Sequence, residues 1–313
     1  MTGVCRFPVA ANVRGERLAG SGTGASGPGR RRLMLRQKYG QRTPRREGTV
    51  VLLASLSRRR RAFVVGLALL AVVAGSTAAA LALLSRAGAA SPAGYPAQNR
   101  PGPVILVPGY GGSTRALSVL ARRIQVTGRA AIVVHLPGNG IGSLIADAAV
   151  LNAAVSRELR AGAPSVDVVG YSAGGVTALL WARDYGGSRK ARRVITLGSP
   201  FHGTSIAAAA AGLAPDACPA ACQELVPGSS LLSALAAGTP ARLRWLSLWT
   251  TDDKTVVPPD SARLAGAIDV PLQSVCPGQQ VSHSQLPTSR AVTAIVLRTI
   301  GPGPFRRPAP GAC

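Results

Sequence analysis

A serine between two glycines stands near the middle of the sequence, in Gly170-Tyr-Ser172-Ala-Gly174. An apolar run at 166–169 precedes it, and a segment compatible with a helix follows at 176–185. A serine hydroxyl is a weak nucleophile until a tight turn presents it to a base, and small neighbours let strand and helix approach each other at that turn. The pattern therefore predicts a nucleophilic Ser172. Because G-x-S-x-G also arises by chance, the interpretation depends on the surrounding sequence.

The glycine-rich loop Pro108-Gly-Tyr110-Gly-Gly112 is the second feature that could do chemistry. In acyl transfer, a backbone N–H from such a loop and the N–H of the residue after the nucleophile must point at the developing oxyanion. We predict Tyr110 and Ala173 as these two donors. The alternatives are a plain turn between strand and helix, or a loop that cradles phosphate. Neither a G-x-G-x-x-G pattern nor a Walker lysine supports phosphate binding here.

Apolar runs and helical patterns alternate in the region that holds both motifs. Strands are predicted at 104–107, 130–134, 166–169, 194–197 and 245–249, and helices at 113–127, 143–161, 176–185, 207–211, 231–237 and 287–300. This alternation predicts an α/β fold, with a doubly wound, mainly parallel sheet and helices on both faces. Ligands of such sheets bind at the carboxyl ends of the strands, where the expected positions include Tyr110, His135, Ser172 and Ser199. The three tryptophans are expected in the core.

Four segments together carry a resemblance to a known family. They are VPGYGG, GYSAGG, GSPFHGT and VSHSQLP, which begin at Val107, Gly170, Gly198 and Val281. With them the sequence resembles the secreted bacterial class 2, or minimal, lipases of the α/β-hydrolase superfamily, over about residues 102–300. The resemblance implies an α/β-hydrolase fold with little or no lid. One departure is Pro108, where many lipases carry histidine before the glycine of the oxyanion loop.

The acid of the expected Ser-His-Asp triad follows the strand at 245–249. Asp252 and Asp253 both occupy that loop. We prefer Asp253, because Asp253-Lys-Thr-Val-Val-Pro258 matches the D-x-x-V-V-P pattern of related hydrolases, and we interpret Asp252 as a neighbour that caps the loop.

The base must come after the acid in this fold. Of the three histidines only His283 does so, since His135 and His202 precede Asp253. We therefore predict Ser172, Asp253 and His283 as the catalytic residues, with His202 bracing its loop; the alternative for His283 is a surface histidine without a role. An apolar groove flanked by Tyr110, Phe201 and Val256 is expected to hold an acyl chain. No metal or cofactor is predicted.

Charge is distributed unevenly along the 313 residues. Residues 1–61 hold 15 Lys and Arg against 2 Asp and Glu, whereas the remainder holds 21 against 10, so the net charge of +24 lies mostly at the start. Residues 1–57 lack apolar periodicity and are expected to form a disordered basic leader. Nucleic-acid binding is not expected, because the segment has few aromatic residues and many helix breakers. A start at Met34 would shorten this leader.

An uncharged run, Ala62 to Leu84, follows four consecutive arginines and is long enough to span a bilayer. We predict a signal peptide or signal-anchor helix at 58–86, with the arginines on the cytoplasmic side and everything after it exported. Ala87-Gly-Ala89 is a candidate cleavage site, so cleavage and anchoring both stay open. A Pro/Gly-rich linker is expected at 87–103, the hydrolase domain at 104–301 and an irregular tail at 302–313.

Four of the five cysteines lie in the exported part, which favours disulfides in an oxidising compartment. We predict Cys218–Cys222 from its short separation and Cys276–Cys313 by exclusion. A zinc site is the alternative, but no histidine pair has ligand spacing.

The leading hypothesis is an exported serine hydrolase that cleaves carboxylic esters of lipids or acylglycerols and acts as a monomer. An acyltransferase or peptidase on the same fold would use the same residues. A binding module without catalysis is the remaining alternative, although it would tolerate loss of Ser172, Asp253 or His283, and all three are present.

Overall fold

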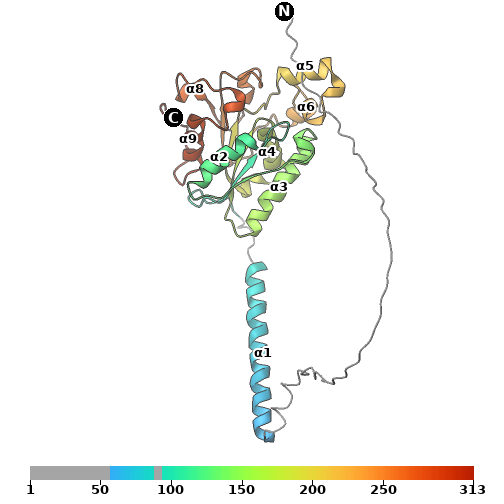
Figure 1. Cartoon of the computed structure of the whole chain (residues 1–313), viewed down its shortest axis with the longest axis vertical. Helices are drawn as coiled ribbons and strands as arrows, with labels where there is room; N and C mark the ends of the chain where they lie inside the picture. The colour runs from blue at the N-terminus through green and yellow to red at the C-terminus, as the bar shows by residue number, and fades with distance from the viewer. Residues whose placement is uncertain (1–56, 88–93) are drawn as a thin grey trace, which may run out of the picture. The chain divides into compact units, whose positions relative to one another are not determined.

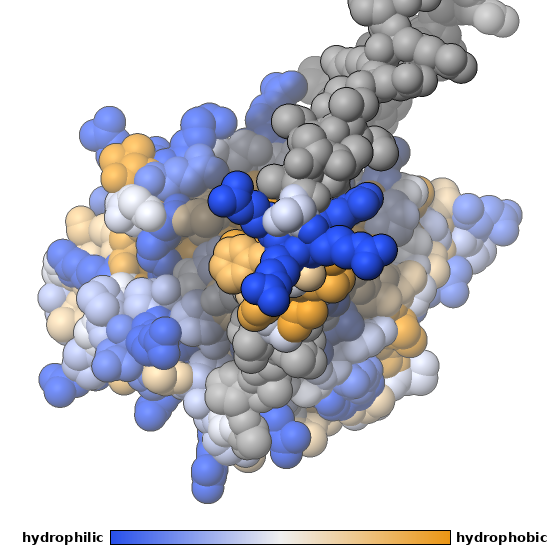
Figure 2. Space-filling model, turned by 90° about the horizontal axis from the view of Figure 1, so that it is seen from below, coloured by the Kyte–Doolittle hydropathy of each residue, from blue (hydrophilic) through white to orange (hydrophobic). Residues whose placement is uncertain are grey.

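The computed structural model describes residues 57–87 and 94–313, and the expected leader lies outside these residues. Helix α1 (Arg58–Ala87) is described by itself. Its segment Arg58–Thr77 has a mean hydropathy of 1.5 and none of it is buried, so among the described residues it is the one helix long and apolar enough to cross a membrane. In Figure 2 this helix is seen from its start, with hydrophilic residues in front of hydrophobic ones.

A six-stranded sheet forms the centre of the rest of the described chain (Figure 1). Its strands run in the order β2-β1-β3-β4-β5-β6, and every neighbouring pair is parallel. Their bounds are β1 (Val104–Val107), β2 (Ala131–Val133), β3 (Val166–Tyr171), β4 (Ala191–Leu197), β5 (Arg244–Trp249) and β6 (Ile268–Pro271). The predicted α/β fold with a parallel sheet is confirmed.

Helices cover both faces of the sheet, and the alternation along β1 shows how each face is filled. Ile105 and Val107 belong to the core beneath α3 (Leu144–Arg160) and α4 (Ala173–Asp184). Val104 and Leu106 belong to the core beneath α2 (Arg115–Gln125) and α9 (Arg290–Ile300). Each fully buried side chain of this kind stabilises the fold by about 1.5–3 kcal/mol. The tryptophans lie in the core as expected, none being more than 2% exposed.

Three short helices fill the segment between β4 and β5: α5 (Ser205–Leu213), α6 (Ala220–Glu224) and α7 (Ser230–Ala234). The Glu224 carboxylate ties α6 to the start of α3, because it accepts hydrogen bonds of 2.7 Å from the Ser143 hydroxyl and from the Leu144 N–H. It thereby satisfies a backbone donor that the first turn of a helix leaves unpaired. The Cys218–Cys222 disulfide closes the turn before α6, as predicted.

Two α-helices and one strand are absent from the predicted set: α6, α8 (Leu272–Val275) and β6. Strand β6 lies at the edge of the sheet, is four residues long and ends at a proline, so its sequence lacks the continuous apolar run of the central strands. The tail after α9 has no helix or strand, and the predicted Cys276–Cys313 disulfide fastens it to the residue after α8.

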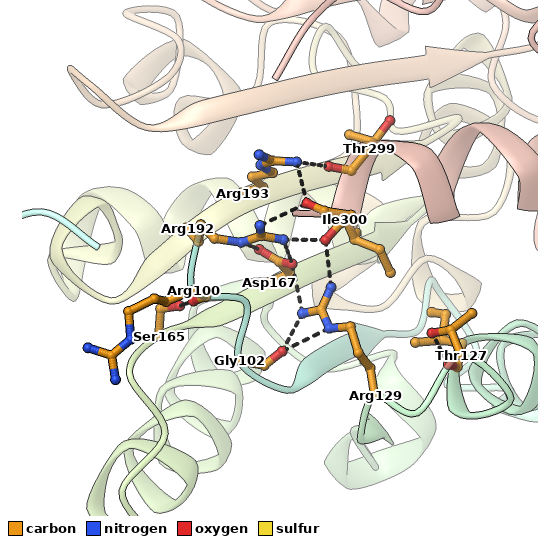
Figure 3. A network of polar contacts seen from close by, with 12 residues as sticks. Arg100, Gly102, Thr127, Arg129, Ser165, Asp167, Arg192, Arg193, Thr299 and Ile300 are labelled. Atoms are coloured by element: carbon orange, nitrogen blue, oxygen red, sulfur yellow. Dashed lines mark hydrogen bonds and ion pairs between the residues drawn. The ribbon is translucent and has the colours of Figure 1, made fainter. Parts of the chain in front are cut away.

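An arginine cluster, made of Arg129, Arg192 and Arg193 around Asp167, lies at the amino edge of the sheet (Figure 3). Asp167 receives hydrogen bonds from Arg129 at 2.8 Å and from Arg192, and both arginines also donate to the carbonyl of Ile300 at the end of α9. A bulge at the start of β4 makes Arg192 an extra residue in the strand and re-aims its neighbours. The cluster thus joins strands β3 and β4 to the last helix.

Candidate active site

Ser172 lies between β3 and α4, in a backbone conformation that non-glycine residues rarely adopt, with φ 54° and ψ −129°. The flanking glycines make this turn possible. A Cβ at Gly170 would lie 2.6 Å from the Cα of Gly175, and one at Gly174 would lie 2.4 Å from the carbonyl oxygens of Val107 and Pro108. The chain around the turn therefore packs too closely for larger residues, and the half-buried serine side chain is directed out of the sheet at its carboxyl edge.

The hydroxyl of Ser172 is hydrogen-bonded to a histidine, which is hydrogen-bonded in turn to an aspartate. The Oγ of Ser172 lies 2.9 Å from Nε2 of His283, and Nδ1 of His283 lies 2.6 Å from Oδ2 of Asp253. The Asp253 side chain is 1% exposed and that of His283 8% exposed. Such an arrangement can transfer the serine proton to the imidazole while the carboxylate holds the other ring nitrogen.

Asp253 follows β5 and is held by its own loop. Its Oδ1 accepts hydrogen bonds from the N–H groups of Thr255 at 2.9 Å and Val256 at 2.8 Å. These two bonds leave Oδ2 for the imidazole. The neighbouring Asp252 accepts instead from Gln273, at 3.3 Å, so of the two candidate acids only Asp253 contacts His283.

His283 opens the 3-10 helix η6 (His283–Gln285), and three contacts fix it there. The side chain of Gln285 accepts from the N–H of Ser282 at 2.9 Å, which closes a capping box around this short helix. The Tyr171 ring lies 5.2 Å from the imidazole, and its hydroxyl donates to the His283 carbonyl at 3.3 Å. Burial, and secondarily the negative charge of Asp253, raise the pKa of Tyr171 to about 12, so it stays a donor over the working range of pH.

Gly198 lies on the other side of the histidine–aspartate pair, in the left-handed region with φ 58°. A Cβ there would stand 3.1 Å from Nδ1 of His283 and 3.2 Å from Oδ2 of Asp253. Tyr171 and Gly198 are contacts of the base that the sequence analysis did not identify as such. Tyr171 could have been suspected, because it directly precedes the nucleophile.

The loop predicted to bind an oxyanion lies beside the serine. A Cβ at Gly109 would be 2.7 Å from the Cβ of Ser172. In the part of the chain that the structure describes, no backbone hydrogen bond of the loops uses the Tyr110 N–H, and Ala173 is the first residue of α4, where N–H groups have no partner within the helix. Among the described residues both predicted donors thus have no backbone partner, and their role in binding an oxyanion stays a prediction.

The other predicted site residues differ in their exposure. Phe201 packs edge-on against Trp245, with ring centroids 6.3 Å apart, and it also lines a cavity of about 230 Å³ together with His202 and Leu232. Val256 is buried and Tyr110 is half-exposed, and a groove flanked by Tyr110, Phe201 and Val256 stays a prediction. His135 is exposed, while the exposed His202 has Nδ1 3.2 Å from the carbonyl oxygen of Ser261, in keeping with a brace for its loop.

Within residues 57–87 and 94–313 no three His, Cys, Asp or Glu side chains gather as metal ligands would. The chemistry available at this site from the chain itself is therefore that of a hydroxyl, an imidazole, a carboxylate and backbone N–H groups.

Comparisons with known proteins agree with the topology. A family model described as alpha/beta hydrolase fold matches residues 102–217. Aspergillus fumigatus lipase B is similar with a TM-score of 0.56 at 18% identity, over 70% of this chain and 56% of that chain. Bacillus licheniformis lipase BlEst2 in its mature form gives a TM-score of 0.53 at 18% identity, over 67% of this chain and 96% of that chain. No curated protein has a matching sequence. These likenesses show that the chain has the α/β-hydrolase fold, and that it spans little more than half of the Aspergillus lipase.

Proposed function

We propose that this chain is an exported serine hydrolase that cleaves carboxylic esters through an acyl-enzyme. The observation that carries the proposal is the continuous hydrogen-bonded series from Asp253 through His283 to Ser172, which ends at a half-buried nucleophile on a strained turn. The three side chains come from three separate loops, and their hydrogen bonds run from carboxylate to imidazole to hydroxyl, which is the arrangement that activates a serine. A purely structural serine would not need this arrangement.

In the first half of the reaction, Ser172 Oγ attacks the ester carbonyl carbon while its proton passes to Nε2 of His283. The carbonyl oxygen becomes an oxyanion, and the N–H groups of Tyr110 and Ala173 stabilise it. When the tetrahedral intermediate collapses, His283 returns the proton to the leaving alcohol and the acyl group stays on Ser172. Asp253 holds the imidazole in the tautomer that accepts at Nε2.

In the second half, His283 removes a proton from water, whose oxygen attacks the acyl carbon. Collapse of the second intermediate releases the carboxylic acid and returns the proton to Ser172 Oγ. The Asp253 loop favours this cycle, because the two N–H groups that bind Oδ1 keep the carboxylate fixed while the imidazole gains and loses charge.

The proposed substrates are esters of short or medium acyl chains, with lipid or acylglycerol esters as the natural class. Two named lipases share the fold, and helices of nine, five and five residues occupy the segment between β4 and β5, where a large apolar cap is absent from the described chain. The class 2 lipases are the group that the sequence motifs favour.

Export is proposed from α1 and the disulfides. The helix carries arginines at its start and no acidic residue in its first turn, and both disulfides lie after it in the chain. Either an anchor or a cleaved signal sequence is compatible with this order.

A fluorophosphonate probe tests the nucleophile on the full chain. We expect covalent labelling of the native protein at Ser172 and none of Ser172→Ala, while Ser199→Ala, which removes another buried serine at the same edge, keeps the label. Matched acyl esters and amides, with and without an added alcohol as acceptor, then identify the reaction. Labelling without ester turnover, or amide cleavage at a comparable rate, would contradict an ester hydrolase.

A further inference from the structure

A cavity lies at the amino edge of β5 and β6, whereas the proposed catalytic residues lie at the carboxyl edge of the sheet. It has a volume of about 560 Å³ and is lined by Tyr95, Pro96, Gln98, Arg242, Leu243, Arg244, Trp245, Gly266, Ile268 and Phe305. Two arginines and three aromatic residues thus line it, and none of the lining residues is acidic. The proposed hydrolysis uses none of these residues.

The charges behind this cavity are not balanced. Arg129 and Arg192 share the carboxylate of Asp167 (Figure 3). Among the described residues, by contrast, Arg193 donates to neutral oxygens alone, those of Thr299, Gly301, Gly303 and Gln98. Burial first, and then the positive charge of Arg192, lower the pKa of Arg193 to about 10, and Arg244 adds to this effect. The amino edge therefore carries more cations than carboxylates, and an anion in the cavity would offset the excess.

Arg242 is presented to the cavity by an unusual backbone. Its φ is 66°, a left-handed conformation that strains a non-glycine residue and often marks a functional position. Its guanidinium lies over the Tyr95 ring, 5.0 Å from the centroid, and the guanidinium of Arg193 lies 5.8 Å from that of Phe305. A guanidinium whose face stacks on an aromatic ring keeps the N–H groups at its edge free. Two of these N–H groups can donate in parallel to two oxygens of one phosphate.

We propose that this cavity binds a phosphate ester, with the exposed Arg242 and Arg244 as the donors to the phosphate and Tyr95 and Phe305 as walls for the adjoining organic group. Phosphate suits the site because two of its oxygens can accept from the two guanidinium groups, neither of which has an acidic partner among the described residues. The phosphate can come from a lipid headgroup or from a soluble ester. Only seven residues separate Tyr95 from Ala87, the last residue of the apolar helix α1, and this favours the headgroup.

Titration calorimetry of the full chain in uncharged detergent micelles tests the site. The background is Ser172→Ala, so that no ester is consumed. The probes are inorganic phosphate and dihexanoyl phosphatidylglycerol. We expect saturable binding that falls at least tenfold in Arg242→Gly/Arg244→Gln, because both donors are lost, while glycine at position 242 relieves the backbone. Arg122→Gln, which removes an exposed arginine of α2, is the matched control and should bind as the parent does.

The two probes distinguish the sources of phosphate. Binding of the lipid alone identifies a headgroup site, and binding of inorganic phosphate identifies a site that soluble phosphate esters also reach. Saturable binding of neither probe, or equal binding by the double variant, would overturn the proposal. With Ser172 restored, the double variant should hydrolyse a soluble ester at the rate of the native chain, so the result is independent of the proposed catalysis.

Discussion

Each edge of the central sheet buries an aspartate, but the two aspartates have partners of different character. At the carboxyl edge Asp253 contacts the imidazole of His283, a type of side chain that can accept and donate a proton. At the amino edge Asp167 contacts the guanidinium groups of Arg129 and Arg192, a type of side chain that only donates hydrogen bonds. The same residue type in the same sheet thus has a partner suited to the proposed proton transfer at one edge and partners suited to holding the fold together at the other.

The largest effect is expected on kcat, from variants of the proposed catalytic residues at the carboxyl edge. Ser172→Ala and His283→Ala should each lower kcat by on the order of 10⁴- to 10⁶-fold, and the double variant by little more, because the two residues act as a unit. For Ser172→Ala the free energy of unfolding should change by less than about 1 kcal/mol. Steady-state kinetics with a soluble ester and urea denaturation measure both quantities. Full additivity of the two losses would show that the residues act separately.

The opposite result is expected at the amino edge. Asp167→Asn leaves Arg129 and Arg192 buried without a counter-charge, which should lower the free energy of unfolding by about 3–5 kcal/mol. The kcat of the molecules that remain folded should be unchanged. Asp184→Asn, which breaks the more exposed pair with Arg183, is the control and should cost less than about 1 kcal/mol. Equal losses in the two variants would mean that the cluster adds no more stability than a surface ion pair.

Asp147 on α3 sharpens the comparison, because this buried aspartate has no cation beside it. Its Oδ2 has no hydrogen-bond partner among the described residues. Burial, and then the charge of Glu224, raise its pKa from 3.8 to about 6. The folded state holds this proton more tightly than the unfolded state does. The contribution of Asp147 to the free energy of unfolding is therefore greatest below about pH 4 and is lost as the pH rises through 6.

Asp147→Asn should therefore stabilise the protein at pH 7 by up to about 3 kcal/mol relative to its effect at pH 4, since two pKa units correspond to about that energy. Urea denaturation of both proteins at the two pH values measures the difference. The same substitution effect at both pH values would show that folding leaves the pKa of Asp147 unchanged, contrary to the expectation.

The smallest expected effect concerns Tyr171. Tyr171→Phe removes the hydrogen bond to the His283 carbonyl but keeps the ring against the imidazole, so kcat should fall about 2- to 10-fold with KM unchanged, as suits a bond of about 0.5–1.5 kcal/mol. Tyr171→Leu removes the ring as well and should lose more. The same Tyr to Phe change at Tyr185, at the end of α4, is the control. An equal loss of kcat in the variants of both tyrosines would show that the Tyr171 hydroxyl does not help to position His283.

The sequence predicts what local patterns determine. Five strands follow from continuous apolar runs, and the order of Ser172, Asp253 and His283 along the chain leads to the residues that meet at the carboxyl edge. The arginine cluster could not be predicted, because a bulge in β4 and the end of α9 bring together Arg192 and Ile300, which are 108 residues apart. The contact of Phe201 with Trp245 could not be predicted either, because the two residues meet only when β4 and β5 pair in the sheet.

The bonds between the segment at 95–102 and the arginine cluster also determine how the domain would carry a mechanical load. Gln98 accepts from Arg192 through its carbonyl at 2.9 Å, and the Gly102 carbonyl accepts from Arg129. Tension applied through the chain before Tyr95 would therefore pass into guanidinium groups that grip β3 and the end of α9. The load would thus enter the domain at the amino edge of the sheet, opposite the edge where Ser172, His283 and Asp253 lie.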